Sequence, residues 1–143
     1  MAITSAVCTS FKVELLKAVH NFSASGGNTF NLALYTSSAS LGASTTAYTT
    51  SNEVSGSGYT AKGNALTSVD PVADSTTAVC DFSDTSFTSA SFTARGCLIF
   101  NDSASGDPAV CVIDFGSDKT VTSGTFTIQF PAQTAGNAII QIA

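Results

Sequence analysis

The sequence predicts an all-β protein: an antiparallel β-sandwich or jelly roll of about seven or eight strands, with one short N-terminal helix. Two observations lead to this fold class. Apolar and polar residues alternate along several segments after Gly27, which is typical of strands with one buried face. Only one stretch, near the N-terminus, has apolar residues at intervals of three and four. No alternation of helices with strands follows, which disfavours a parallel sheet.

The single predicted helix spans residues 10–22. Its apolar face would consist of Phe11, Leu15, Ala18, Val19 and Phe22. Ser10 is the predicted N-cap, because its hydroxyl can accept a first-turn N–H, and the Ser- and Gly-rich residues 23–27 end the helix. His20 falls between the apolar positions and is predicted to be solvated. Residues 1–9 are predicted to form an N-terminal arm outside the sandwich.

Three segments show the alternation of half-buried strands. In residues 30–35 the set Phe30, Leu32 and Leu34 is predicted to share one buried face. Alternation of the same kind occurs at residues 78–82 and 125–130. Each of these segments is therefore expected to cover a core with one face only.

Two other segments, residues 97–100 and 109–113, are apolar on both faces and are predicted to be central strands. The turn-rich residues 101–108 between them predict a hairpin loop. Residues 138–142 are the last predicted strand. Residues 36–63 show little periodicity, and they form either a functional arm or a pair of exposed strands.

Length and composition indicate one domain, residues 1–143, with an unusual surface. Charged residues make up 10% of the chain, whereas about 25% is usual. Serine and threonine fill the difference, with 21 and 20 copies. We therefore expect a surface covered by hydroxyl groups.

Charge and hydropathy exclude several classes of partner. The net charge is −5, and the five basic residues are scattered singly along the chain: Lys12, Lys17, Lys62, Arg95 and Lys119. Nucleic acids and anionic membranes require clustered cations, so neither is an expected partner. No apolar run is long enough to span a bilayer, and no signal peptide is visible. The chain is expected to be made and folded in a cytosol.

The cysteines predict no metal site. Cys8, Cys80, Cys97 and Cys111 contain no C-x-x-C pair. Reduced in a cytosol, they are interpreted as small buried apolar residues. The alternative is a disulfide that forms after release from the cell.

No arrangement of residues predicts catalysis. His20 is the only histidine and hence the only candidate base for a Ser-His-Asp arrangement. Two carboxylate pairs lie in turn-like sequence, where aspartates cap backbone N–H groups: Asp81 with Asp84, and Asp102 with Asp107. Gly58 and Gly63 have the spacing of a phosphate loop without its Lys-Ser/Thr, and predict turns instead. The prediction is a protein that is not an enzyme, with no catalytic, cofactor-binding or metal-binding residues.

Two charged residues are candidates for a structural role. Glu53 lies in a stretch otherwise free of acids, and Arg95, the only arginine, precedes the most apolar strand. An arginine there can pair with a carboxylate. The sequence therefore suggests an ion pair between Glu53 and Arg95, with an exposed arginine at a sheet edge as the alternative.

Several strings along the chain resemble small virion proteins of tailed bacteriophages. The most specific are residues 52–63 (NEVSGSGYTAKG) and 93–96 (TARG). The others are residues 11–16 (FKVELL), 29–36 (TFNLALYT), 112–119 (VIDFGSDK), 130–131 (FP) and 138–142 (AIIQI). The resemblance extends from about Phe11 to Ile142 and implies a structural component of a phage particle, made in the host cytoplasm and located in the virion.

Within that class, the leading expectation is a capsid decoration (cement) protein that binds the major capsid protein on the outside of the assembled head. The acidic charge disfavours a position inside a head packed with DNA. A homotrimer is expected only by analogy with other β-rich cement proteins. The alternative is a tail, neck or fibre component, although a receptor-binding tip would show more exposed aromatic residues than three tyrosines and no tryptophan. A small hydrolase is a third possibility that lacks a convergent site.

Overall fold

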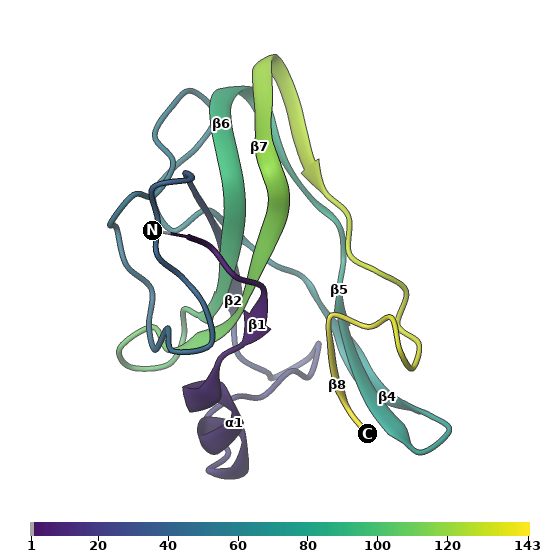
Figure 1. The fold of residues 1–143 in the computed structure, drawn as a ribbon. Coiled ribbons are helices and arrows are strands. Elements are labelled where there is room, and N and C mark those ends of the chain that lie inside the picture. Colours follow the sequence, from purple (N-terminus) through teal and green to yellow (C-terminus); the bar gives the residue numbers. More distant parts are fainter. Residues whose placement is uncertain (1) are drawn as a thin grey trace.

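The structure is a computed structural model that describes residues 2–143, and it confirms an all-β fold with two antiparallel sheets and one short helix (Figure 1). In chain order the elements are β1 (Ala6–Val7), α1 (Thr9–Leu16), β2 (Phe30–Tyr35), β3 (Asn64–Ala65), β4 (Ser68–Asp74), β5 (Thr77–Phe82), β6 (Thr85–Asn101), β7 (Ala109–Ile128) and β8 (Ile140–Ile142).

A five-stranded sheet and a three-stranded sheet make up the sandwich. The larger sheet has the order β1-β7-β6-β2-β3, and the smaller one has the order β4-β5-β8. All neighbouring strands are antiparallel. The two strands that the sequence predicted as central, in residues 97–100 and 109–113, lie side by side within the larger sheet and are buried, as expected.

The β6–β7 hairpin is the longest feature of the fold, with strands of 17 and 20 residues. Its inner half pairs Gly96–Phe100 with Ala109–Asp114, and its outer half pairs Thr85–Ala94 with Lys119–Ile128. The register shifts between Ala94 and Gly96, where the two halves meet. In Figure 1, β7 rises to the top of the molecule, turns over and returns on the other side. The predicted loop at residues 101–108 closes this hairpin.

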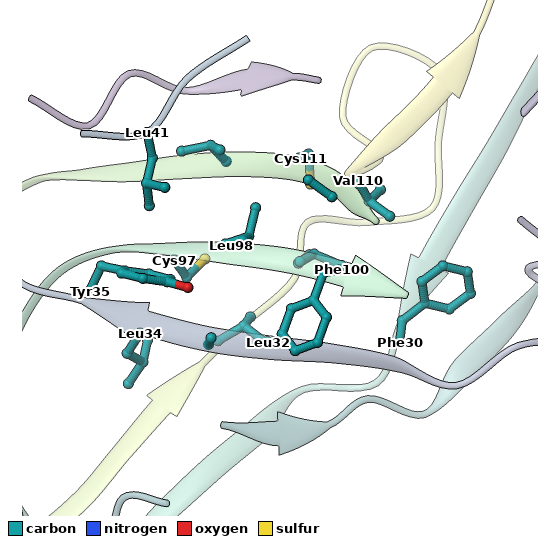
Figure 2. Packing of buried hydrophobic residues seen from close by; sticks show 14 of the residues in the cluster. Phe30, Leu32, Leu34, Tyr35, Leu41, Cys97, Leu98, Phe100, Val110 and Cys111 are labelled. Atoms are coloured by element: carbon teal, nitrogen blue, oxygen red, sulfur yellow. The ribbon is translucent and has the colours of Figure 1, made fainter. Parts of the chain in front are cut away.

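Strand β2 is buried along its whole length, so the expectation of one buried face was wrong. Residues 36–63 cover the face that carries Asn31 and Tyr35. The Tyr35 hydroxyl donates to the carbonyl of Thr49 at 2.7 Å, and the Tyr48 ring stacks on Phe100 with centroids 4.8 Å apart. Figure 2 shows β2 beside the apolar side chains of its neighbours.

Residues 36–63 themselves form neither a free arm nor a pair of exposed strands. They contain no named strand and touch the sheet through isolated bridges, such as that between Glu53 and Tyr35. Ala39, Leu41 and Val54 from this segment are buried in the core. The segment is thus an irregular cover over the larger sheet.

The helix is shorter than predicted. It ends at Leu16 rather than at residue 22, because the chain reverses at Ala18, whose φ is +60°. Cys8 occupies the N-cap position without a side-chain hydrogen bond, so the assignment of Ser10 as N-cap was wrong. The reversal brings His20 inward, and its side chain is fully buried rather than solvated.

The expectation of a free N-terminal arm was also wrong for residues 2–9, while residue 1 lies outside the described residues. Ile3 is buried and bridges to Leu41. Ala6 pairs with Val112 in the larger sheet, and Cys8 is completely buried. This segment is an integral edge of the sandwich.

In the smaller sheet, β5 and β8 lie where the sequence predicted strands, but the pattern of buried residues differs from the prediction. A strand near the C-terminus is confirmed as β8, which pairs with β5. In β5 the predicted alternation holds only in part, because Phe82 is buried as expected while Val79 is buried and Ala78 is exposed. The one helix in residues 2–143 is not long enough to cross a membrane.

Candidate functional site

Glu53 is the centre of a polar cluster inside residues 36–63. Its carboxylate accepts hydrogen bonds from the hydroxyls of Tyr48 at 2.7 Å and Tyr59 at 3.1 Å, and from the backbone N–H of Lys62 at 3.0 Å. The Tyr59 hydroxyl in turn accepts the N–H of Leu34 at 2.9 Å. The cluster therefore joins the irregular segment to strand β2.

This cluster keeps its phenols protonated. Burial and the hydrogen bond to Glu53 raise the pKa of Tyr48 to about 12. Burial raises the pKa values of Tyr35 and Tyr59 well above their ordinary value, and the charge of Glu53 adds to both shifts. The tyrosines act as hydrogen-bond donors here, and a role as proton-transferring groups near neutral pH is not supported.

Lys62 connects the same segment to the loop at residues 101–108. Its Nζ lies 2.8 Å from a carboxylate oxygen of Asp102 and 2.8 Å from one of Asp107. It also lies 5.7 Å from the ring centroid of Tyr48, within cation–π range. The hydrogen bonds to both aspartates raise the pKa of Lys62. Asp102 and Asp107, which the sequence predicted only as turn residues, thus share one cation.

The suggested ion pair between Glu53 and Arg95 does not form. Arg95 Nε instead lies 3.2 Å from Asp114 Oδ1, and its Nη1 lies 3.9 Å from Asp118. The register explains this choice, because Gly96 pairs with Asp114 across the β6–β7 hairpin. The backbone N–H of Gly116 and the Arg95 guanidinium lower the pKa of Asp114. Glu53 has its full set of partners within its own segment.

His20 lies in a buried aromatic group rather than beside a nucleophile. Its ring is 4.9 Å from that of Phe11 and 6.2 Å from that of Phe30, centroid to centroid. Nδ1 is 3.1 Å from the side-chain amide nitrogen of Asn101, and Nε2 is 3.1 Å from Glu14 Oε1. Because the Asn101 oxygen accepts from Ser103, its nitrogen donates to Nδ1, and Nε2 then carries the proton that bonds to Glu14. His20 thereby links α1 to the end of β6.

The cysteines are free thiols, and Cys8, Cys97 and Cys111 are buried as the sequence predicted, while Cys80 is half-buried. Burial raises the pKa of Cys8 to about 11 and that of Cys97 to about 12. Such thiols are poor nucleophiles near neutral pH. Among residues 2–143, no group of three or more His, Cys, Asp or Glu side chains could hold a metal ion.

Asp81 and Asp84, the other candidate pair, bond to separate backbone groups. Asp81 accepts the N–H of Phe82 at 2.8 Å, and Asp84 accepts the N–H of Phe130 at 2.9 Å. The Asp81 contact is local, as the sequence predicted, whereas the Asp84 contact joins the start of β6 to the segment after β7. The pair is not directed at a common point.

Two hollows remain on the surface. The larger, which we call the β1–β7 groove, has a volume of about 840 Å³ and lies between β1, both halves of β7 and the segment that follows β7. The smaller, the α1–β8 groove, has a volume of about 420 Å³ and lies between the end of α1, residues 20–23 and the smaller sheet. Both are lined mainly by apolar side chains.

A few large apolar side chains are exposed on α1, β4 and β8. Within residues 2–143, the large apolar residues with at least about half of their surface exposed are Val13 and Leu16 of α1, Val72 of β4 and Ile142 of β8. In Figure 1, α1 lies apart from β4 and β8 in the lower half of the molecule. Val72 pairs with Val79 and Ile142 pairs with Ala78, so Val72 and Ile142 lie on opposite faces of the smaller sheet. Leu16 is 90% exposed, which is unusual for leucine. The sequence predicted a strand at residues 138–142 without indicating that Ile142 would be 56% exposed.

Comparisons with models of protein families, with curated proteins and with solved structures found no match to this chain.

Proposed function

We propose that this protein is a structural component of a bacteriophage particle that decorates the outer surface of the assembled head by binding the major capsid protein. The proposal rests on the resemblance of its sequence strings to small virion proteins. It is supported by one structural observation: the apolar surface formed by Val13 and Leu16 on α1, on a domain that is otherwise rich in hydroxyl groups.

An apolar surface of this kind favours a protein partner. Exposed apolar patches on soluble domains commonly mark interaction sites. Leu16 and Val13 lie three residues apart on α1, so they share one face of the helix. The adjacent α1–β8 groove would receive a side chain from the partner. This end of the molecule is therefore the proposed contact with the capsid.

Residues 2–9 and 36–63 are poorly suited to contact a capsid. Both are packed against the larger sheet, with Ile3, Cys8 and Val54 buried. Releasing either segment to reach a partner would expose these side chains to water. Removing residues 1–9 is accordingly expected to destabilise the domain.

The chemistry of the surface sets the expected salt dependence. Lys62 and Arg95 already have carboxylate partners within the chain. Contacts with a capsid would then depend on apolar area and hydrogen bonds, which salt screens weakly. Binding to heads should change little between low and physiological ionic strength.

The test uses heads that lack the protein, prepared from a phage with the gene deleted, to which purified protein is added back. Binding is measured by co-sedimentation for the natural chain, for Leu16→Ser and for Thr122→Ser, an exposed change on the outer half of β7. Leu16→Ser should weaken binding about tenfold, which is the loss of one buried leucine side chain. Thr122→Ser should bind like the natural chain.

The phenotype of the deletion separates the proposal from its alternative. Heads without the protein should burst at lower temperature, and complete particles should carry hundreds of copies if the analogy with cement proteins holds. A handful of copies, with normal heat resistance but defective tails or adsorption, would overturn head decoration in favour of a tail, neck or fibre role. Sedimentation of the bound and free protein tests the proposed trimer.

A further inference from the structure

The β1–β7 groove has a size and lining suited to a small ligand, separately from the surface proposed for the capsid. Its volume of about 840 Å³ falls within the ~300–1,000 Å³ of typical ligand pockets. Its floor consists of buried residues of the larger sheet, Cys97, Cys111 and Val112. Its walls are half-buried apolar residues that reach solvent through the groove: Val7, Ile113, Phe115, Phe126, Ile128, Phe130 and Ile139.

The walls are held in place by the core. Phe126 packs against Phe87, Phe92 and Phe115, with centroid distances of 6.4, 5.2 and 6.2 Å. Phe130 packs against Phe82 at 5.6 Å. Because these rings are fixed from behind, the groove stays open without a ligand. A preformed apolar site loses little conformational entropy when a ligand enters it.

One charge lies at this groove. Lys119 is the only charged residue in its lining. Among the described residues, Lys119 has no carboxylate within ion-pair distance, whereas Lys62 and Arg95 each have two. Ser5 adds a hydroxyl that can donate a hydrogen bond, since its oxygen already accepts the N–H of Asp114. The groove thus combines a long apolar surface with a single unpaired cation.

We propose that the β1–β7 groove binds an amphiphile with one long apolar chain and one carboxylate, such as a fatty acid. The apolar chain lies along Phe115, Phe126 and Ile128, and the carboxylate pairs with the ammonium group of Lys119. The net charge of −5 disfavours anions elsewhere on the protein, so the local cation directs the head group to this site. A neutral apolar molecule would leave Lys119 unused.

The first experiment measures binding of dodecanoate, below its micelle-forming concentration, to the full chain by isothermal titration calorimetry. We expect one site and an affinity that increases from octanoate to dodecanoate, because each methylene adds apolar contact. Dodecanol provides the same chain without the charge and should bind about fivefold more weakly, the effect of one partly exposed ion pair. No binding of dodecanoate, or equal binding of dodecanoate and dodecanol, would overturn the proposal.

A matched pair of variants locates the head group. Lys119→Met should weaken dodecanoate binding to the level of dodecanol and leave dodecanol binding unchanged. Lys12→Met, which removes an exposed lysine from α1, should change neither affinity. Both variants alter exposed side chains, and circular dichroism verifies their fold. Equal losses in both would show that only net charge matters, contrary to the proposal.

The position of the chain is tested by NMR of methyl groups. Dodecanoate should shift the methyl signals of Ile113 and Ile128, which line the β1–β7 groove, and leave those of Ala78 and Ile142 in the α1–β8 groove unchanged. Shifts confined to Ala78 and Ile142 would assign the ligand to the other groove and refute the site proposed here. Capsid binding by Leu16→Ser is a separate measurement, so failure of either proposal leaves the other standing.

Discussion

Residues 36–63 and the β6–β7 hairpin are the least regular and the most regular parts of the sandwich. The hairpin is held by a long antiparallel backbone ladder, and most of its outward side chains are small hydroxyl residues. Residues 36–63 have no strand, and side chains hold them instead, above all Glu53 and Lys62. The comparison shows which side chains determine the fold of a chain with few charges. The hairpin can be formed by many different residues, whereas the irregular segment depends on a few particular side chains.

The largest effect on stability is expected at alkaline pH, where residues 36–63 should unfold before the hairpin does. The chain has three tyrosines, Tyr35, Tyr48 and Tyr59, and all of them lie at this segment. Their raised pKa values mean that the folded state holds the phenolic protons more tightly than the unfolded state does. This stabilisation is complete below pH 10 and is lost as the pH rises through about 12, the pKa of Tyr48.

Absorbance of tyrosinate and circular dichroism, followed together, check this prediction. The two signals should change in one cooperative step above pH 10, because ionisation requires the segment to open. Tyrosines that titrate near pH 10 while the β-sheet signal stays intact would contradict it.

Gly63→Ala should destabilise the protein by about 3 kcal/mol or more. Gly63 has a φ of +67°, and a Cβ there would lie 1.8 Å from the carbonyl oxygen of Leu32. Gly106, in the loop of the hairpin, has a φ of +82° with no atom within 4 Å of its Cβ position. Gly106→Ala should therefore lose only the conformational term, about 1 kcal/mol. Equal losses in urea unfolding of the two variants would disprove a close approach at Gly63.

Glu53→Gln should reduce the free energy of unfolding by about 2 kcal/mol, because a charged acceptor of three hydrogen bonds is replaced by a neutral one with a misplaced donor. Asp118→Asn makes the same change in net charge at an exposed side chain whose nearest cation is 3.9 Å away. That control should change stability by no more than about 0.5 kcal/mol. Both variants are measured by chemical denaturation. If Glu53→Gln loses no more free energy of unfolding than Asp118→Asn, Glu53 has no special role.

The smallest effect is expected on the hairpin surface. The hydroxyls of Thr93 and Thr120 lie 2.8 Å apart across the ladder and are exposed. A double-mutant cycle with Thr93→Ala and Thr120→Ala should give a coupling energy below about 1 kcal/mol. A coupling energy as large as the loss at Glu53 would show that the hydroxyl ladder is as specific as the irregular segment, and would remove the distinction drawn above.

Sequence patterns predicted the fold class, the two central strands and the loop between them, because continuous apolar runs report burial on both faces directly. They did not predict that the hairpin turns over between Ala94 and Gly96, since alternation reports the local face of a strand and not its bending. Nor did they predict the early end of α1, because the reversal at Ala18 leaves the three-and-four spacing of apolar residues intact.

The candidate site shows the same limit. Glu53 and Arg95 were recognised as isolated charges, but their partners depend on register and on a cover that has no periodic signal. Arg95 meets Asp114 only because Gly96 lies opposite Asp114 in the ladder. The β1–β7 groove is formed by residues from four separate parts of the chain, so no local pattern could indicate it.

The first two strands of the chain pair with strands that come late in the sequence, and this determines the order in which the sheet can form during translation. Strand β1 pairs with β7, with Ala6 opposite Val112, and β2 pairs with β6, with Phe30 opposite Asn101. On the ribosome, β1 and β2 therefore wait without partners until most of the chain has emerged, whereas the β6–β7 hairpin closes through its own short loop. The hairpin acts as the template on which the earlier strands assemble. Until it appears, Cys8 and the apolar length of β2 stay exposed in the nascent chain, which is the period of greatest vulnerability to aggregation.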